Sequence, residues 1–160
     1  MIYILMALAV FTLDCNLKNY IERHFKLSDK KDILKGRITV RKQYNSGFCL
    51  NVMDNRIDIV KKASAAILGA VVLVFMMILP GKKKTLTKLG LSLCIGGAAS
   101  NVKDRFNKGY VVDYFSINFK PIKHIVFNLA DIFIFIGSIM VFLTSLHNPE
   151  KIDNLQKKID

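Results

Sequence analysis

Four long apolar runs, separated by polar stretches, dominate the pattern of hydrophobic and polar positions along the chain. A helix needs about 20 mostly apolar residues to cross a bilayer, and flanking polar residues extend the two shorter runs to this length. We therefore predict an α-helical polytopic membrane protein. Its four transmembrane helices are expected at about 2–18, 61–80, 86–102 and 125–146.

The first apolar run, Ile2 to Leu13, also fits the apolar region of a cleavable signal peptide. No basic residue precedes this run, however, and no small-x-small cleavage site follows it. We therefore interpret it as an uncleaved first span.

Between the spans, the chain offers two longer loops and two short polar segments. The loops, at about 19–60 and 103–124, are expected on one side of the membrane. The turn 81–85 and the tail 147–160 are expected on the other. Within the first loop, β-branched or apolar residues at Arg37 to Val40 and Phe48 to Met53 predict short strands, so we expect a small β-like cradle between spans one and two. Residues 1–160 are treated as a single domain.

Because successive spans alternate in direction, the end of span one, the loop after it, the end of span three and the start of span four share one side. That side collects nearly all the unusual polar residues, namely Asp14, Lys18, Asn45, Asn101, Asp104, Arg105, Asp113, Asn128 and Asp131. The pattern therefore predicts a single polar site at one membrane face.

Charge adds a second constraint. A net charge of +12 is compatible with a nucleic-acid partner or with an anionic lipid surface. The mean hydropathy is +0.32, and the chain has no basic stripe interleaved with aromatic residues. Both features favour a lipid surface as the partner, so we expect no nucleic-acid partner. Charge does not fix the orientation. The side of the polar site has 17 Lys and Arg against 7 on the other, but those 7 include the compact turn from Lys82 to Lys88.

Cysteine and histidine positions indicate no metal chemistry. The chain has an odd number of cysteines, Cys15, Cys49 and Cys94, and no two of them form a C-x-x-C motif, so we expect free thiols. The three histidines are far apart in sequence and match no H-E-x-x-H motif, which counts against a membrane metallopeptidase. We therefore expect no metal site.

Two aspartates are candidates for catalysis. Asp131 lies a few residues into the fourth span, where an ionisable group is costly and generally faces a bundle interior, and Asn128 shares its helix face. Asp113 lies in an alternating segment from Tyr110 to Phe119, a pattern that favours an extended conformation, and the following loop can return it to the start of span four. Two carboxyls together in a poorly solvated site share a proton and act as base and acid on a water, as in aspartic proteases. The alternative is a non-catalytic membrane protein, such as a transporter or assembly factor, in which Asp131 pairs with Arg105 between helices.

Three sequence blocks carry a resemblance to a known family. Residues 96–105 match the pattern G-G-A-x-x-N-x-x-D-R, residues 109–114 match G-x-V-V-D-[FY], and residues 127–131 match F-N-x-A-D. In this order and spacing, the blocks resemble those of lipoprotein signal peptidases (signal peptidase II), which are membrane aspartic peptidases. The resemblance extends over essentially the whole chain, from Ile2 to about Leu146.

The N-terminal half is more divergent from this family. Asp14 and Lys18 fit its D-Q-x-x-K pattern, with Cys15 in place of the glutamine. Asn45 fits its R-N-x-G pattern, with Tyr44 in place of the arginine. These departures affect the expected fit of the substrate rather than the catalytic positions.

The resemblance implies an endopeptidase that cleaves before the diacylglyceryl-modified Cys of prolipoproteins, without a metal or organic cofactor. It implies a multi-pass protein of the bacterial cytoplasmic membrane, in contact with membrane lipid, with its site on the extracytoplasmic side. We expect a monomer. The implied catalytic pair is Asp113 and Asp131, and the substrate-binding or supporting residues are Asp14, Lys18, Asn45, Gly97, Asn101, Asp104, Arg105, Asn128 and Ala130.

Overall fold

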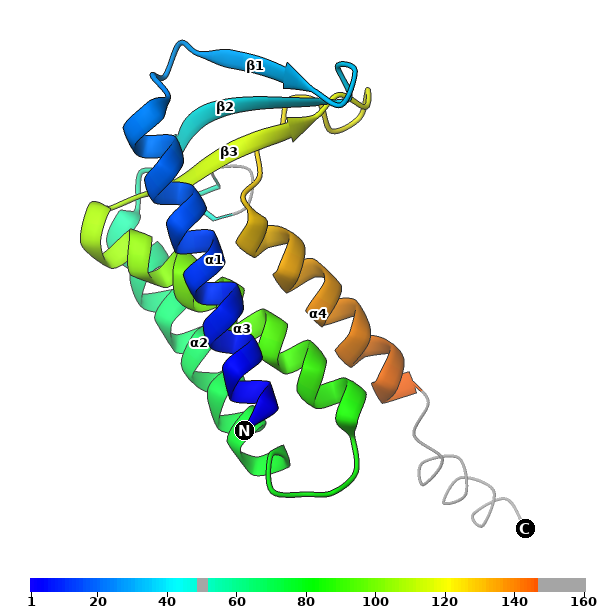
Figure 1. Ribbon diagram of the computed structural model, residues 1–160. Helices are drawn as coiled ribbons and strands as arrows, with labels where there is room; N and C mark the ends of the chain where they lie inside the picture. Colours follow the sequence, from blue (N-terminus) through cyan, green and yellow to red (C-terminus); the bar gives the residue numbers. More distant parts are fainter. Residues whose placement is uncertain (49–51, 147–160) are drawn as a thin grey trace, which may run out of the picture.

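The structure, a computed structural model, describes residues 1–48 and 52–146 (Figure 1). Within these residues it contains four helices and a three-stranded sheet. The helices are α1 (Ile2–His24), α2 (Ile57–Ile78), α3 (Thr85–Lys108) and α4 (Leu129–Leu146). The strands are β1 (Lys30–Ile33), β2 (Ile38–Asn45) and β3 (Val111–Ile117).

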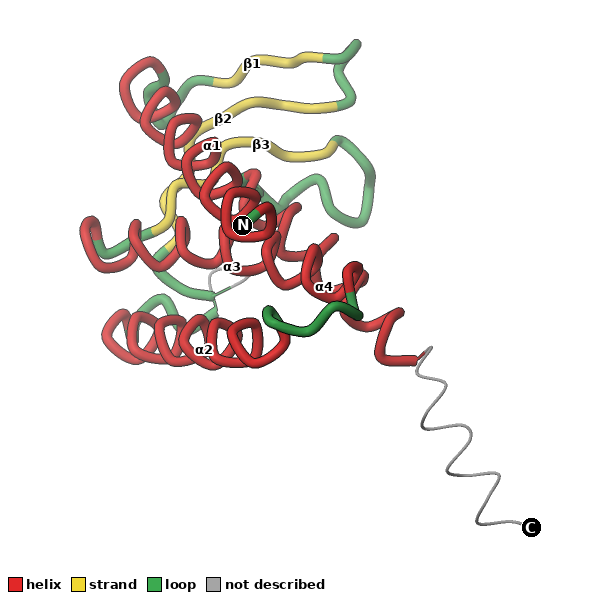
Figure 2. Tube along the Cα trace, turned by 60° about the horizontal axis from the view of Figure 1, so that its bottom comes forward, coloured by secondary structure: helices red, strands yellow, loops and turns green. Residues whose placement is uncertain are grey.

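Three of these helices, α1, α2 and α4, are long and apolar enough to cross a membrane. The third helix in sequence, α3, is as long but buries several polar residues, among them Lys88, Asn101 and Asp104. It packs against α1, α2 and α4 and lies between them (Figure 2), so its polar side chains face protein instead of lipid. The predicted polytopic helical architecture with a small sheet is confirmed.

The helix ends differ from the expected spans at the face that carries the sheet. Helix α1 continues to His24, past the expected end of the first span at Lys18. Its last turns are held because Ile21 packs against Val112 and Tyr114 of β3. Helix α4 begins at Leu129, later than the expected 125, because the preceding residues pair with β3.

The sheet is antiparallel in the order β1, β2, β3, and it draws its third strand from the loop after α3. The strand predicted at Arg37 to Val40 lies on β2, and the extended segment predicted around Asp113 is β3. The strand predicted at Phe48 to Met53 includes residues 49–51, and thus Cys49, which lie outside the described residues. Phe48, Val52 and Met53 themselves are not in a strand.

Small residues allow α3 to approach α4 closely. A Cβ atom added at Gly97 would lie 2.7 Å from the carbonyl oxygen of Ala130, and one added at Gly90 would lie 2.7 Å from that of Gly137. Only glycine fits at such contacts, since backbones meet without intervening side chains. This close approach brings the polar end of α3 against the beginning of α4.

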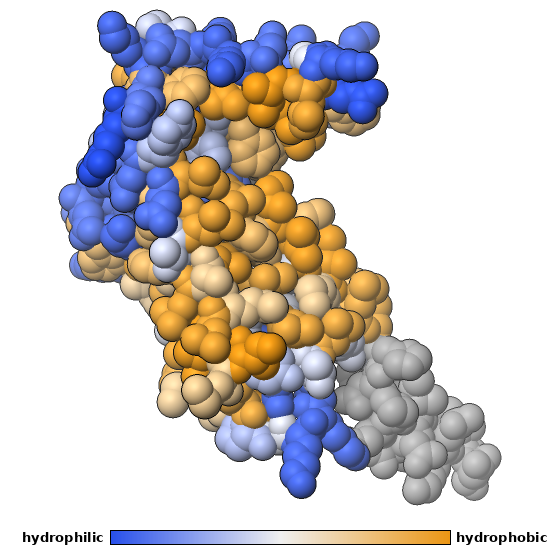
Figure 3. Space-filling model, in the orientation of Figure 1, coloured by the Kyte–Doolittle hydropathy of each residue, from blue (hydrophilic) through white to orange (hydrophobic). Residues whose placement is uncertain are grey.

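The surface is divided into zones along the helices. On the face shown in Figure 3, an apolar band covers the helical part of the molecule, and hydrophilic residues gather at the sheet and at the opposite end. On α2, Leu73 and Met77 are 62% and 81% exposed. Such exposure of large apolar side chains over several helices is the pattern of a lipid-facing surface.

Candidate active site

The backbone pairing of β3 determines how the site is built. On the edge of β3 away from β2, the N–H of Phe127 donates to the carbonyl of Phe115 at 2.7 Å, and the N–H of Tyr114 donates to the carbonyl of Phe127 at 2.8 Å. This bridge places Asn128, the residue before α4, beside Asp113. Strand β3 and the segment that leads into α4 are therefore joined by main-chain hydrogen bonds.

Asn128 contacts both candidate catalytic carboxyls. Its side-chain amide donates to Oδ1 of Asp113 at 2.7 Å, and its backbone N–H donates to Oδ2 of Asp131 at 3.0 Å. Its side-chain oxygen in turn accepts the N–H of Asp131 at 2.9 Å and so caps the first turn of α4. Asn128 is fully buried. The two carboxyls are thus held by one residue.

Two further amides complete the hydrogen bonding of the pair. Asn45, at the end of β2, donates to Oδ2 of Asp113 at 3.1 Å. Asn101, on α3, donates to Oδ1 of Asp131 at 3.1 Å and accepts from the amide of Asn128 at 3.3 Å. Each carboxyl oxygen of the pair therefore has an amide donor, from β2, α3 or the start of α4.

The electrostatics of Asp113 are those of a carboxyl that keeps its proton easily. Burial, followed by the negative charge of Asp131, raises the pKa of Asp113 from 3.8 to about 7. The hydrogen bonds from Asn45 and Asn128 oppose this shift without cancelling it. Near neutral pH the pair can hold one proton and one negative charge, as an acid and a base acting together require.

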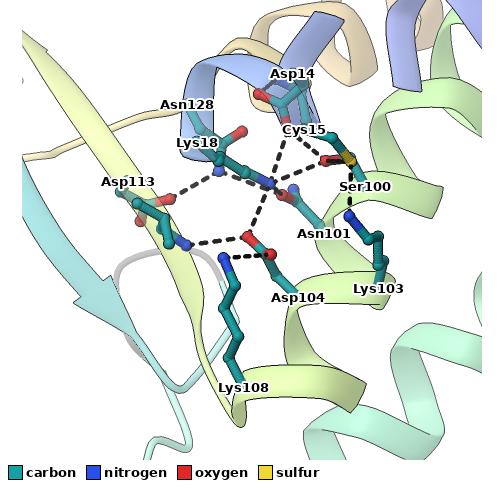
Figure 4. Close-up of polar contacts among 12 residues, drawn as sticks. Asp14, Cys15, Lys18, Ser100, Asn101, Lys103, Asp104, Lys108, Asp113 and Asn128 are labelled. Atoms are coloured by element: carbon teal, nitrogen blue, oxygen red, sulfur yellow. Dashed lines mark hydrogen bonds and ion pairs between the residues drawn. The ribbon is translucent and has the colours of Figure 1, made fainter. Parts of the chain in front are cut away.

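Behind the pair lies a fully buried ionic network centred on Asp14 and Lys18 of α1, shown in Figure 4. Lys18 contacts Asp14 at 2.7 Å, Asn101 at 2.6 Å and Asp104 at 3.4 Å. Ser100 donates to Asp14 at 2.6 Å. A buried charge is tolerated only when it is paired and hydrogen-bonded, and the partners of the Lys18 ammonium come from α1 and α3. The network fixes the helix face that presents Asn101.

Asp14 also holds the beginning of α4. Its Oδ1 accepts the backbone N–H of Ala130 at 3.1 Å and the hydroxyl of Tyr114 at 3.2 Å. That same hydroxyl accepts the N–H of Leu129 at 2.9 Å. Free N–H groups at a helix N-terminus attract negative charge, so the Asp14 carboxylate stabilises this end of α4. Asp14 thereby positions the turn that carries Asp131.

The end of α3 is tied to the sheet and to α1. Asp104 accepts the N–H of Val112 at 3.4 Å and pairs with Lys108 at 3.0 Å, and Lys108 also pairs with Glu22 at 2.5 Å. Gly109 ends α3 with a φ of +86°, a left-handed conformation that suits glycine, and the chain then enters β3. The block around residue 109 thus forms the turn that delivers Asp113.

Arg105 does not make the interhelical pair considered above. Its guanidinium donates to the carbonyl of Gly47 at 2.7 Å, and among the described residues no ion pair joins it to Asp131. Its Nε is buried without a hydrogen-bond partner among these residues. Arg105 therefore connects α3 to the segment that follows β2.

The structure brings all eleven predicted site residues into one cluster or into the packing that supports it. Gly97 and Ala130 make the close helix contact, and the other nine take part in the polar contacts described above. Sequence reasoning missed Tyr114 and Ser100. Tyr114 follows Asp113 within a recognised block, so its position was signalled, but nothing in the sequence indicated its hydrogen bond to Asp14.

Cys15, which replaces the expected glutamine, lies at the edge of this network. Its sulfur is 3.5 Å from both Ser100 Oγ and Lys103 Nζ. Tyr44, which replaces the expected arginine, packs against Tyr110 with ring centroids 4.1 Å apart and the ring planes tilted by 34°. Across residues 1–48 and 52–146, no three His, Cys, Asp or Glu side chains are grouped to hold a metal ion.

Solved structures share this fold. One described as a bacterial membrane enzyme at 2.3 Å resolution matches with a TM-score of 0.80 and 21% identity, covering 93% of this chain and 90% of that one. A second bacterial membrane enzyme, at 1.9 Å resolution, matches with a TM-score of 0.75 and 22% identity, covering 90% and 92% of the two chains. At these identities the likeness establishes the architecture.

Sequence comparison identifies the family. A lipoprotein signal peptidase from Lactobacillus johnsonii is 32% identical over 150 residues, covering 94% of this chain and 95% of the relative. One from a Nostoc species is 31% identical over 143 residues, covering 89% and 88%. The family model described as signal peptidase (SPase) II matches residues 6–147. The chain, with its paired carboxyls at the junction of β3 and α4, belongs to the signal peptidase II family.

Proposed function

We propose that this protein removes signal peptides from diacylglyceryl-modified prolipoproteins by cleaving before the lipidated Cys, with Asp113 and Asp131 as the catalytic carboxyls. The names of its curated relatives support the substrate class. The observation that carries the catalytic assignment is the position of Asn128, which donates one hydrogen bond to each carboxyl. This arrangement serves a shared proton and a water held between two acids.

In this mechanism Asp113 carries the proton and Asp131 accepts one from the attacking water. The raised pKa of Asp113 favours its neutral form near pH 7, so it can donate a proton to the peptide carbonyl as the tetrahedral intermediate forms. Asp131 lies in the first turn of α4, where backbone N–H groups favour an anion. The titration belongs to the pair, since each carboxyl senses the other.

The sheet offers an apolar surface beside the pair for the lipidated substrate. Cross-strand partners on one sheet face are Val40 with Phe115 and Ile38 with Ile117, and Asp113 lies on the same side of β3 as Phe115. Figure 3 shows an apolar hollow between the sheet and α4. Acyl chains buried there contribute about 0.8 kcal/mol per CH₂, which favours lipidated over unmodified precursor.

The proposal includes a position in the cell. The protein resides in the bacterial cytoplasmic membrane as a monomer in contact with lipid, with spans at about 2–18, 61–80, 86–102 and 125–146 forming one domain. The sheet and the carboxyl pair face the extracytoplasmic side, which places both termini in the cytoplasm. This side suits a substrate whose modified Cys lies at the outer surface, at the depth where α4 begins.

Cleavage of a lipidated prolipoprotein by purified protein in detergent, compared with Asp113→Asn and Asp131→Asn, tests the proposal. We expect each variant to lose at least about 10³-fold in kcat while retaining a folded, membrane-inserted protein. The variant Asp58→Asn, at an exposed position in the first turn of α2, serves as a matched control. Turnover of either site variant at the rate of the unchanged protein would refute the catalytic assignment.

The non-catalytic alternative, with Asp131 as a structural partner of Arg105, makes the opposite prediction. It expects Asp131→Asn to lower the melting temperature strongly, with no cleavage by the unchanged protein. The absence of an Arg105–Asp131 ion pair among the described residues counts against it. The hydrogen bonds of Asp131 come instead from Asn101 and from the backbone of Asn128, whose side chain donates to Asp113.

A further inference from the structure

The end of the sheet opposite α1 carries an exposed cluster that the proposed peptidase chemistry does not use. The β1–β2 turn and the segment after β3 meet there, since the N–H of Asn118 donates to the carbonyl of Arg37 at 2.8 Å. We name this cluster the sheet tip. It consists of Leu34, Lys35, Arg37, Phe119, Lys120 and Lys123.

The sheet tip combines exposed apolar side chains with unneutralised positive charge. Leu34 and Phe119 are 65% and 63% exposed. The segments 33–38 and 117–126 contain four Lys and Arg and no Asp or Glu. None of these cations is in an ion pair among the described residues. The nearest carboxylate along β1, Asp32, accepts the hydroxyl of Thr39 at 2.5 Å.

The backbone holds this cluster in a costly conformation. Leu34 and Lys35 have φ values of +51° and +58°, in the left-handed region that non-glycine residues rarely adopt. The side chain of Asn118 stabilises the turn by donating to the carbonyl of Gly36 at 2.6 Å. Strain of this kind persists when the surrounding structure enforces it, and it is typical of functional surfaces. Here it keeps Leu34 directed out of the protein.

The tip also lies where a bilayer would reach it. In Figure 1 the helices lean from lower right to upper left, whereas the sheet extends to the right, so its tip hangs over α4. Figure 3 shows that the sheet face toward α4 is apolar and runs into the apolar band of the helices. On α4, Phe135 and Phe142 are 65% and 60% exposed. The apolar face of the sheet therefore connects the overhanging tip to the lipid-facing surface of the helices.

We propose that the sheet tip docks on anionic phospholipid headgroups of the bilayer in which the helices lie. Leu34 and Phe119 enter the interfacial layer, and the four cations contact lipid phosphates. Apolar side chains flanked by Lys and Arg are the pattern of elements that rest in a membrane interface. The docking requires only membrane insertion, so it does not depend on the proposed peptidase activity.

The test exploits the absence of tryptophan from the chain. The variant Leu34→Trp has a single tryptophan. It is reconstituted in phosphatidylcholine vesicles with or without phosphatidylglycerol, and brominated acyl chains serve as quenchers of the tryptophan emission. We expect a blue-shifted, quenched emission in the anionic vesicles. The quenching should weaken about twofold or more without phosphatidylglycerol or at high salt, since exposed charges are screened within about 10 Å at 0.1 M.

The matched control is Leu27→Trp, at the other end of β1 and 61% exposed, whose emission should stay solvent-like. A second variant adds Lys35→Gln, Arg37→Gln, Lys120→Gln and Lys123→Gln to Leu34→Trp, and should remove the effect of phosphatidylglycerol. Emission from Leu34→Trp that is unquenched, or equally quenched in both lipids, overturns the proposal. So does a response to added polyglutamate without one to anionic lipid, which would indicate an acidic protein partner. Salt dependence of the single variant decides the question if the multiple variant fails to fold.

Discussion

The side-chain amide of Asn128 lies 2.7 Å from Oδ1 of Asp113 and donates to it, while the same residue caps the helix that carries the second carboxyl. The relative position of the two acids thus depends on a residue with no ionisable group. Such a residue affects the geometry of a reaction without supplying its protons.

Replacing Asn128 by Ala should therefore lower kcat about 10²-fold with a smaller effect on KM, because Asp113 loses its side-chain donor and the turn that carries Asp131 loses its cap. Kinetics on a lipidated precursor measure this split. Asn107→Ala, at an exposed position near the end of α3, should leave both constants unchanged. A rise in KM of about the same factor, with kcat unaltered, would mean that Asn128 acts only in substrate binding.

The pKa of Asp113 predicts how activity depends on pH. Cleavage should fall about tenfold per pH unit above about pH 7, where Asp113 loses the proton that the reaction needs. It should also fall in acid, where both carboxyls are protonated. A profile of kcat/KM against pH that stays flat between pH 6 and about 9 would contradict the role of Asp113 as acid.

The shifted pKa of Asp113 also predicts how the stability of the folded protein changes with pH. The folded-state pKa of Asp113, about 7, lies above its ordinary value of 3.8, so the folded protein binds the proton more tightly than the unfolded chain. Its contribution to stability is present below about pH 4 and is lost as pH rises toward about 7. The melting temperature of Asp113→Asn in detergent should therefore rise relative to that of the unchanged protein as the pH increases across this range. A difference independent of pH would contradict the shifted pKa.

Tyr114→Phe should separate positioning from chemistry. The change removes the hydroxyl that joins Asp14 to the N–H of Leu129, leaving buried groups without a partner at a cost of about 1–3 kcal/mol. We expect a lower melting temperature and a roughly tenfold loss in kcat through displacement of Asp131, with the pH profile retained. Tyr20→Phe, at an exposed position on α1, is the control.

Gly97→Ala tests the close contact between α3 and α4. The new methyl group would lie 2.7 Å from the carbonyl oxygen of Ala130, so the helices must separate at a cost of about 1–3 kcal/mol. Activity should fall together with stability because Asn101 and Asp131 move apart. Gly69→Ala on α2, where nothing lies within 4 Å, should leave stability unchanged or raise it.

The sequence predicted the helical architecture because apolar runs report directly on the lipid environment. Alternation of spans also placed the polar residues on one side, and the structure brings those same residues together. The pairing of Phe127 with β3 could not be predicted, since it is a main-chain contact independent of side-chain identity. The hydrogen bond from Tyr114 to Asp14 could not be predicted either, because it joins residues 100 positions apart in the sequence.

The central position of α3 has a consequence for how the chain enters the membrane. Among the described helices it is the one too polar to qualify as a span by composition, so it is poorly suited to enter lipid alone. Helix α2 precedes it through a short turn and packs against it, exposing apolar residues on its outer surface. We expect α2 and α3 to insert as a helical hairpin, with α2 shielding from lipid the polar residues that later complete the site.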